Sequence, residues 1–176
     1  RAAISGETGL LRSLEAAAKA RGLRRSRAEI KAAIAAGAEA VAALIAALAE
    51  AARAPALGDD VPPLPRVVLP IDQGEELFAA EGGDEASGFL HLVHYLVVDP
   101  HSNLIVLVTI RSDAYEQLQT AGPLEGIRQE TFSRPPLPRG AYQTVIEGPA
   151  ARLRDTPRAL KIEPALTAAL LADIES

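Results

Sequence analysis

The chain has 176 residues, of which 48% are apolar and 23% charged, so it can bury a core of its own. Its net charge of −5 argues against a general nucleic-acid-binding surface, which would need an excess of basic residues. The absence of cysteine excludes disulfides, thiol chemistry and cysteine-based zinc sites. Because only 3% of the residues are aromatic, we expect a core of alanine, leucine, isoleucine and valine.

The first third of the chain is predicted to be helical. Apolar residues at positions 10, 11, 14 and 18 fall on one face of a helix near residues 7–20. Gly22 is expected to lie just past the end of this helix, where glycine is common. Ser26 and Glu29 have the spacing of a capping box. They predict the start of one long helix that runs to about residue 54.

Part of this long helix, residues 32–49, is nearly uncharged, so a membrane span has to be weighed. Alanine contributes little to membrane transfer, and Glu39 falls in mid-segment, where an acid costs several kcal/mol. We therefore expect a helix packed within the protein, or one that meets a protein partner through its small residues, and no membrane partner. The prolines between residues 55 and 65 predict a linker, which marks the main internal boundary.

Two apolar runs, residues 67–71 and 104–110, predict buried strands of an α/β sheet, and the second run is typical of a strand that is covered on both faces. Asp72 directly follows the first run, and Arg111 follows the second. Because the carboxyl ends of parallel strands meet at one edge of a sheet, where ligands bind, the two residues should converge there. An acid and an arginine suit a Mg²⁺-bound triphosphate. A structural salt bridge is the alternative.

The rest of the chain predicts further elements around these strands. His91 and His94 are three residues apart, but a third ligand of fixed spacing is lacking, so zinc is not expected. We expect helices at residues 84–96, 139–153 and 163–174 and a weak strand at residues 128–132.

An ordered series of motifs resembles a known family. Residues 72–78, Asp-Gln-Gly-Glu-Glu-Leu-Phe, are similar to the Asp-Gln-x-Glu-Glu-Leu-Phe signature of the novel STAND NTPases, bacterial signal-transduction ATPases related to AAA+ proteins. Residues 110–115 resemble the Arg-x-Asp-Phe/Tyr segment that closes the next strand in that family. Pro136-Leu137 and residues 145–150 resemble its later Pro-Leu and Ile-x-x-Pro-Ala segments. The series spans roughly residues 66–175.

The resemblance implies an α/β fold, a partial three-layer P-loop NTPase with a parallel sheet in the strand order 5-1-4-3-2. Residues 67–71 would then be strand three, residues 104–110 strand four and residues 128–132 strand five. Strands three and four would pair in parallel, and strand five would not pair with strand four. The implied domains are a helical segment at 1–60, a partial NTPase core at 61–138 and the start of a helical lid at 139–176.

The resemblance also implies roles for the acidic motif. Asp72 would be the Walker B ligand of Mg²⁺. Gln73 would lie beside the nucleotide, where many AAA+ proteins have a catalytic glutamate. Glu75 or Glu76 would then activate water from one turn further on. For Glu76 we prefer the alternative, a first-turn acid favoured by the helix dipole.

Arg111 would be the sensor arginine near the γ-phosphate, with Asp113 as the N-cap of the following helix. Pro149 would shape the adenine side of the site. The implied catalytic residues are Glu75 and Arg111, the metal ligand is Asp72, and the nucleotide-binding residues are Asp72, Gln73, Arg111 and Pro149.

The chain departs from the family pattern because it lacks the Walker A motif G-x-x-x-x-G-K-[ST]. The nearest candidate, Ser5–Leu11, has no lysine to contact the β- and γ-phosphates. The Gly-Leu-Pro-Leu-type motif of the family is missing too, and the first residue is arginine. We therefore expect an internal segment of a longer ATPase.

Three functions remain open. The favoured one is part of the ATPase module of a bacterial STAND signalling or defence protein, cytoplasmic, with ATP and Mg²⁺ bound in the intact parent. It would act through protein partners or self-oligomerisation, without nucleic acid, and the segment alone would be inactive. The second is a nucleotide-independent interaction scaffold that keeps the fold. The third is a hydrolase that uses Asp72, Glu75 and Glu76 with a metal.

Overall fold

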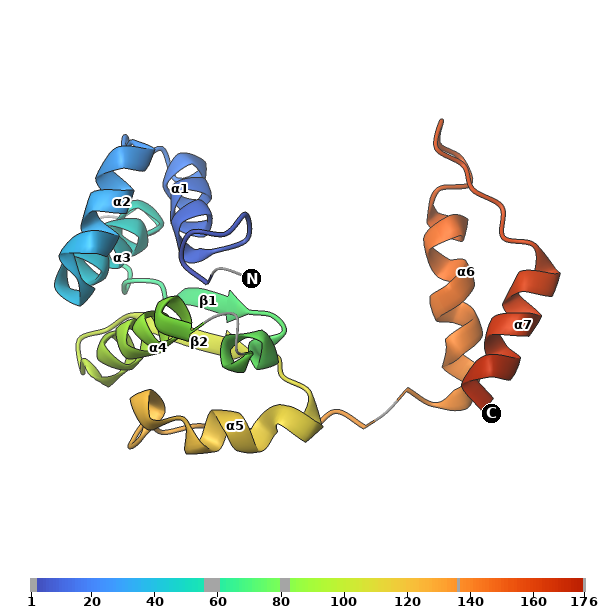
Figure 1. The fold of residues 1–176 in the computed structure, drawn as a ribbon. Helices are drawn as coiled ribbons and strands as arrows, with labels where there is room; N and C mark the ends of the chain where they lie inside the picture. Colours follow the sequence, from blue (N-terminus) through green and yellow to red (C-terminus); the bar gives the residue numbers. More distant parts are fainter. Residues whose placement is uncertain (1–2, 56–60, 80–82, 136, 176) are drawn as a thin grey trace. The chain divides into compact units, whose positions relative to one another are not determined.

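The computed structural model describes residues 3–55, 61–79, 83–135 and 137–175. The chain divides into two compact units, Arg1–Arg128 and Gln129–Ser176. In the first unit, helices and two strands form an α/β arrangement (Figure 1). Its elements are α1 (Leu10–Ala20), α2 (Arg27–Ala36), α3 (Ala38–Ala51), β1 (Val67–Ile71), η1 (Gly74–Phe78), α4 (Gly83–Val98), β2 (Leu104–Val108), η3 (Ser112–Ala114), α5 (Tyr115–Thr120) and η4 (Gly122–Leu124), where η denotes a 3₁₀-helix.

The second unit contains η5 (Arg139–Ala141), α6 (Tyr142–Arg152) and α7 (Pro164–Glu175). The two helices confirm the predictions at residues 139–153 and 163–174 to within a few residues. They pack against each other, with Ala150 and Thr167 buried.

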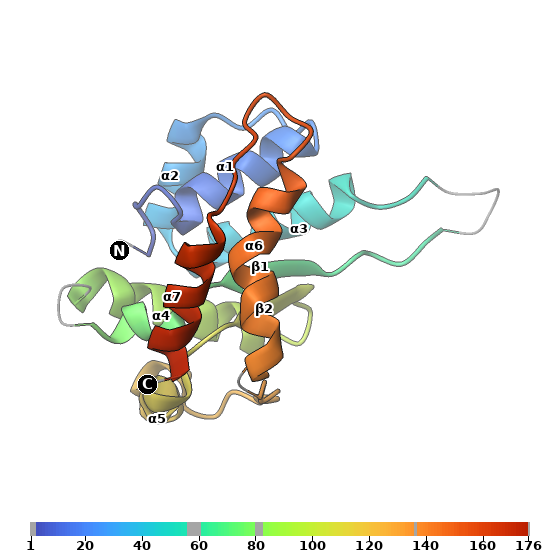
Figure 2. The ribbon, with the colours of Figure 1, turned by 90° about the vertical axis from the view of Figure 1, so that its right-hand side faces the viewer.

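The two strands pair in parallel along their whole length, with Val67 opposite Leu104 and Ile71 opposite Val108. Helix α4 connects the end of β1 to the start of β2, as a parallel pair requires. Figures 1 and 2 show α4 beside the strands and α1–α3 grouped beyond β1. The predicted parallel strands and the helix between them are therefore confirmed, although β2 ends at Val108 and not at residue 110.

The strand predicted at residues 128–132 is wrong. These residues have no regular secondary structure, and every one of them is exposed. The segment has polar residues at positions 128–131, so it offers no apolar run whose burial would stabilise a strand. Within the part of the chain that the structure describes, the sheet has two strands.

The end of α1 and the start of α2 agree with the sequence signals. Gly22 has a φ of +70°, and the N–H groups of Gly22 and Leu23 bond the carbonyls of Lys19 and Ala18 at 3.2 and 2.9 Å, which is a Schellman motif. At the next helix, the Glu29 N–H donates to Ser26 Oγ at 3.2 Å, and the Ser26 N–H donates to Glu29 Oε2 at 2.7 Å. The predicted capping box is therefore confirmed.

The prediction of one long helix to residue 54 is wrong, because Gly37 divides it into α2 and α3. Gly37 has φ +105° and ψ −169°, a conformation that residues with a Cβ rarely adopt. The chain changes direction there, and both Ile30 before the break and Val41 after it are fully buried. Neither part of the broken helix is long enough to cross a membrane, and no other described helix is long and apolar enough to do so.

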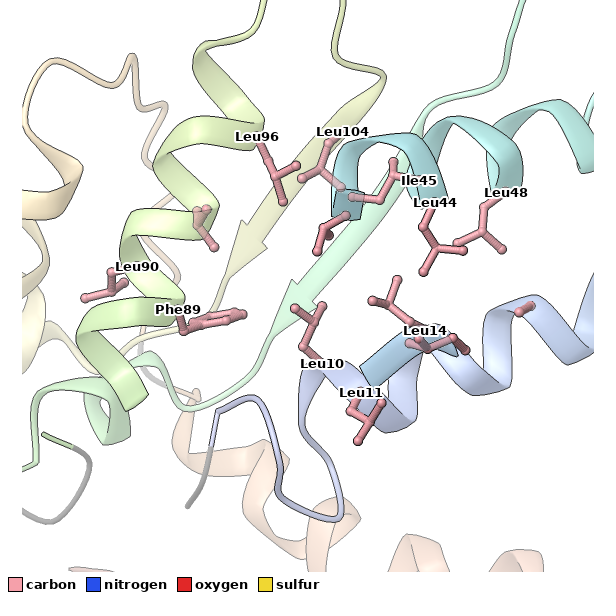
Figure 3. Packing of buried hydrophobic residues seen from close by; sticks show 14 of the residues in the cluster. Leu10, Leu11, Leu14, Leu44, Ile45, Leu48, Phe89, Leu90, Leu96 and Leu104 are labelled. Atoms are coloured by element: carbon pink, nitrogen blue, oxygen red, sulfur yellow. The ribbon is translucent and has the colours of Figure 1, made fainter. Parts of the chain in front are cut away.

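One apolar cluster holds the first unit together. It lies on one face of the sheet, between the strands and helices α1, α3 and α4 (Figure 3). The side chains of Val68, Ile105 and Leu107 point to the other face and are 53%, 48% and 55% exposed. The expectation that both faces are covered is wrong for the described residues, because the helices pack on the same side. The cluster includes Leu10, Leu11, Leu14, Ala18, Ile30, Val41, Leu44, Ile45, Leu48, Phe89, Leu90, Val93, Leu96 and Leu104.

We predict opposite stability effects for two glycine-to-alanine substitutions. Gly37→Ala should lower the free energy of unfolding by about 1–3 kcal/mol, because alanine is strained at this φ although a Cβ there would meet no neighbouring atom. Gly88→Ala, inside α4 and equally free of neighbours, should raise it by about 0.5–1 kcal/mol. Urea unfolding followed by circular dichroism measures both. Equal effects would show that the break at Gly37 is not required.

Candidate functional site

Asp72 lies at the carboxyl edge of the sheet, where it directly follows β1. The Thr109 side chain, just beyond β2, donates a short hydrogen bond from its hydroxyl to Asp72 Oδ1. The Gln73 N–H approaches both side chains, at 3.1 Å from Asp72 Oδ1 and 3.2 Å from Thr109 Oγ1. The ends of the two strands are therefore joined through side chains as well as through the sheet.

The chain turns sharply after Asp72. Gln73 has φ 57° and ψ 52° and, among the described residues, is the one non-glycine residue with a positive φ. The Gly74 N–H then bonds the Thr109 carbonyl at 2.7 Å. A Cβ at position 74 would lie only 2.6 Å from Val108 Cγ1 and 3.2 Å from the Thr109 carbonyl oxygen. A glycine is therefore needed where η1 crosses the end of β2.

Glu75 and Arg111 lie at the same edge. Glu75 Oε2 accepts a long hydrogen bond, 3.4 Å, from the backbone N–H of Arg111. The Arg111 guanidinium instead forms a bidentate salt bridge with Asp113. Its Nε lies 3.1 Å from Oδ1, and its Nη2 lies 2.6 Å from Oδ2. The prediction that Asp113 caps the following helix is wrong, because the N-cap of η3 is Arg111 and no side chain caps it.

The structure thus brings together four of the residues predicted for the site: Asp72, Gln73, Glu75 and Arg111. Pro149, the fifth, belongs to the second unit, where it is exposed in the body of α6.

The sequence of the chain also matches a known protein family. The model of novel STAND NTPase 1 matches residues 7–176. The chain belongs to the novel STAND NTPase 1 family. This membership confirms the resemblance found in residues 72–78 and in the later motifs. Neither a curated protein nor a solved structure gives a significant match to the chain.

Two residues that shape this edge of the STAND chain were missed from its sequence. Thr109 is the one hydroxyl residue in the apolar run 104–110, and it comes just after the strand. Gly74 occupies the variable position of the acidic motif, so the motif itself gives it no role. A polar residue at the end of the second strand was the available signal for Thr109. The close approach to Val108 that makes glycine necessary at position 74 is visible only in three dimensions.

The edge is acidic. Asp72, Glu75 and Asp113 bring three carboxylates to it, beside the guanidinium of Arg111. Within the described ranges, no three residues of the types His, Cys, Asp and Glu are arranged to hold a metal ion by themselves.

The segment nearest to a Walker A motif is folded onto α4. The backbone N–H groups of Ile4 and Ser5 donate to Glu85 Oε1 at 2.9 and 2.7 Å, and the Ser5 hydroxyl donates to Oε2 at 3.4 Å. A Cβ at Gly9 would lie 2.8 Å from the Ile4 carbonyl oxygen, so the loop is closed on itself. In this STAND chain, the backbone N–H of Ser5, the first residue of the candidate Ser5–Leu11, is thus bound to a carboxylate of the protein.

We call the hydrogen bonds from Ile4 and Ser5 to the Glu85 carboxylate the latch between the N-terminal loop and α4. The latch should make the free energy of unfolding depend on pH. Burial acts to raise the pKa of Glu85, but the hydrogen bonds from Ser5 and Ile4 outweigh it, and the pKa lies below its ordinary 4.5. The resulting stabilisation is complete above pH 4.5 and is lost as the pH falls through the lowered value.

We therefore expect Glu85→Gln to be less stable than the wild type at pH 7 and to approach it at pH 3, as measured by urea unfolding. Ser5→Ala, which removes only the 3.4 Å hydroxyl bond, should have the smaller effect. A stability gap that stays constant with pH would contradict the latch.

The tight turn at Gly74 gives another prediction. Gly74→Ala should destabilise the chain by about 2 kcal/mol, because the new methyl group overlaps the stiff side chain of Val108. In a Val108→Ala background, the same substitution should cost clearly less, because the nearest clashing atom is gone. A thermodynamic cycle of the four proteins measures this coupling. Additive effects would show that the close contact does not exist.

Proposed function

We propose that this chain is part of the ATPase module of a STAND signalling or defence protein and carries the metal-binding edge of that module. The observation that supports this most is the convergence of Asp72 and Arg111 at the carboxyl ends of two parallel strands, where nucleotides bind in open α/β sheets. Membership of the novel STAND NTPase 1 family supports the same conclusion.

In this proposal Asp72 is the ligand of Mg²⁺. Thr109 and Gln73 both bond the same carboxylate oxygen, Oδ1, so the metal would take the other oxygen. A single carboxylate fits Mg²⁺, which usually binds one or two protein carboxylates and completes its shell with phosphates and water. The bound ion would also offset the negative charge of this edge, which otherwise repels a triphosphate.

The other expected residues take roles around the metal. Glu75 would act on the attacking water, since Gln73 has no basic carboxylate, and Arg111 would contact the terminal phosphate. Pro149 would lie near the adenine, with α6 and α7 as the beginning of the lid. The phosphate-binding loop, absent from these residues, would come from another strand of a complete three-layer sheet in the order 5-1-4-3-2.

The remaining expectations are proposals of the same kind. The segments 1–60, 61–138 and 139–176 would be a helical insertion, the partial core and the lid. The module would work in the bacterial cytoplasm through protein partners or self-association rather than nucleic acid, in keeping with the net charge of −5.

A nucleotide-independent scaffold is the second candidate. It is favoured by the missing Walker A lysine and by the exposed apolar side chains of Val68, Ile105 and Leu107, which a protein partner could cover. A Walker A motif upstream in the same open reading frame would decide for the ATPase. A metal-dependent hydrolase based on Asp72, Glu75 and Glu76 has less support, because no three acids of the described residues form a metal site.

We expect Asp72→Asn to abolish Mg²⁺-dependent ATP turnover in a protein that contains this chain and a phosphate-binding loop. Asparagine keeps an oxygen for the Thr109 and Gln73 hydrogen bonds, so the fold should survive while the charged metal ligand is lost. Asp84→Asn, an exposed acid in the first turn of α4, is the matched control and should retain turnover. Turnover near the wild-type rate in Asp72→Asn would reject Asp72 as the metal ligand.

A further inference from the structure

Arg111 already has a partner at the proposed site. Two nitrogens of its guanidinium face the two carboxylate oxygens of Asp113, at 3.1 and 2.6 Å. Asp113 follows Arg111 by two residues in sequence, and the 3₁₀ turn of η3 lets the two side chains meet within one short segment. Glu75 is also close, but it contacts the backbone N–H of Arg111 and not the guanidinium. Of these two carboxylates, Asp113 is thus the one that pairs with the guanidinium of Arg111.

This pair has the geometry that Arg111 would use for a phosphate. Arginine binds carboxylates and phosphates alike through two parallel N–H···O bonds, so one group excludes the other from the same nitrogens. The side chains of Arg111 and Asp113 are 70% and 64% exposed. Pairs this exposed are weak, because water and salt compete with them, so an incoming phosphate can displace the carboxylate.

We propose that Asp113 is the resident counter-ion of Arg111, which a phosphate group of the nucleotide must displace before Arg111 can bind it. The inference rests on the proposed function, since it concerns the regulation of the same site. Asp113 would lower the affinity of the empty edge for phosphate. It would also keep Arg111 from pairing with other anions until a metal-bound polyphosphate arrives.

The test uses magnesium tripolyphosphate as the probe and the 176-residue chain as the protein. Binding is followed by NMR at the Arg111 Nε–H signal and at the backbone amides of residues 109–113. Asp113→Asn should bind the probe about three-fold more tightly than the wild type, which is the displacement of one exposed ion pair expressed as a ratio of dissociation constants. Asp113→Glu, which keeps the charge, should stay close to the wild type.

Two further variants separate the pair from general charge. Glu116→Gln removes another exposed acid, three residues further on, and should change the affinity much less than Asp113→Asn does. Arg111→Gln should weaken binding, and adding Asp113→Asn to it should bring no gain, because Asp113 acts through Arg111. An equal gain from Glu116→Gln, or a gain that persists without Arg111, would overturn the proposal.

The outcomes also separate this inference from the proposed function. If the Arg111 signal responds to the probe equally in the wild type and in Asp113→Asn, the phosphate contact stands and the counter-ion role is rejected. If Arg111 responds in neither protein, its phosphate contact and the counter-ion role are both rejected, whereas the metal-binding edge is tested separately by the turnover of Asp72→Asn.

Discussion

The hydrogen bond from the Thr109 hydroxyl to Asp72 joins the ends of the two strands, and the rest of the site depends on it. It fixes the carboxylate just as the chain leaves β1, and the Gln73 N–H completes the arrangement from the next residue. The left-handed turn at Gln73 then directs η1 back over β2, so that Glu75 reaches the backbone of Arg111. Side chains separated by more than thirty residues in sequence are held together by parallel pairing and a few polar contacts.

Much of this edge could be predicted from the sequence, because strong local signals coincide there. A continuous apolar run that ends in an acid specifies both a strand and the place where it leaves the core, and this was true of residues 67–72. Ser26 and Glu29 predicted a helix start equally well, since a capping box depends only on neighbouring residues.

Other features could not be predicted because the free energies of the competing local structures are similar. A glycine inside a helix costs only about 1 kcal/mol, so the pattern around Gly37 did not distinguish a tolerated glycine from a break. The packing favours the break, because Ile30 before Gly37 and Val41 after it are both buried. Asp113 had two short-range options, capping η3 or pairing with Arg111, and only the conformation of η3 selects between them. Likewise, an apolar strand does not reveal whether one or both of its faces are covered.

The connection from β1 through α4 to β2 is made of consecutive elements, and its apolar contacts lie mostly on one face of the sheet. Because Val67 pairs with Leu104 and everything between them is part of this unit, its formation during synthesis on the ribosome does not have to wait for residues beyond β2. The carboxylate and the guanidinium would then be in place before distant segments of the polypeptide arrive. Until another surface covers them, the half-exposed side chains of Val68, Ile105 and Leu107 would make the nascent chain prone to associate with other chains.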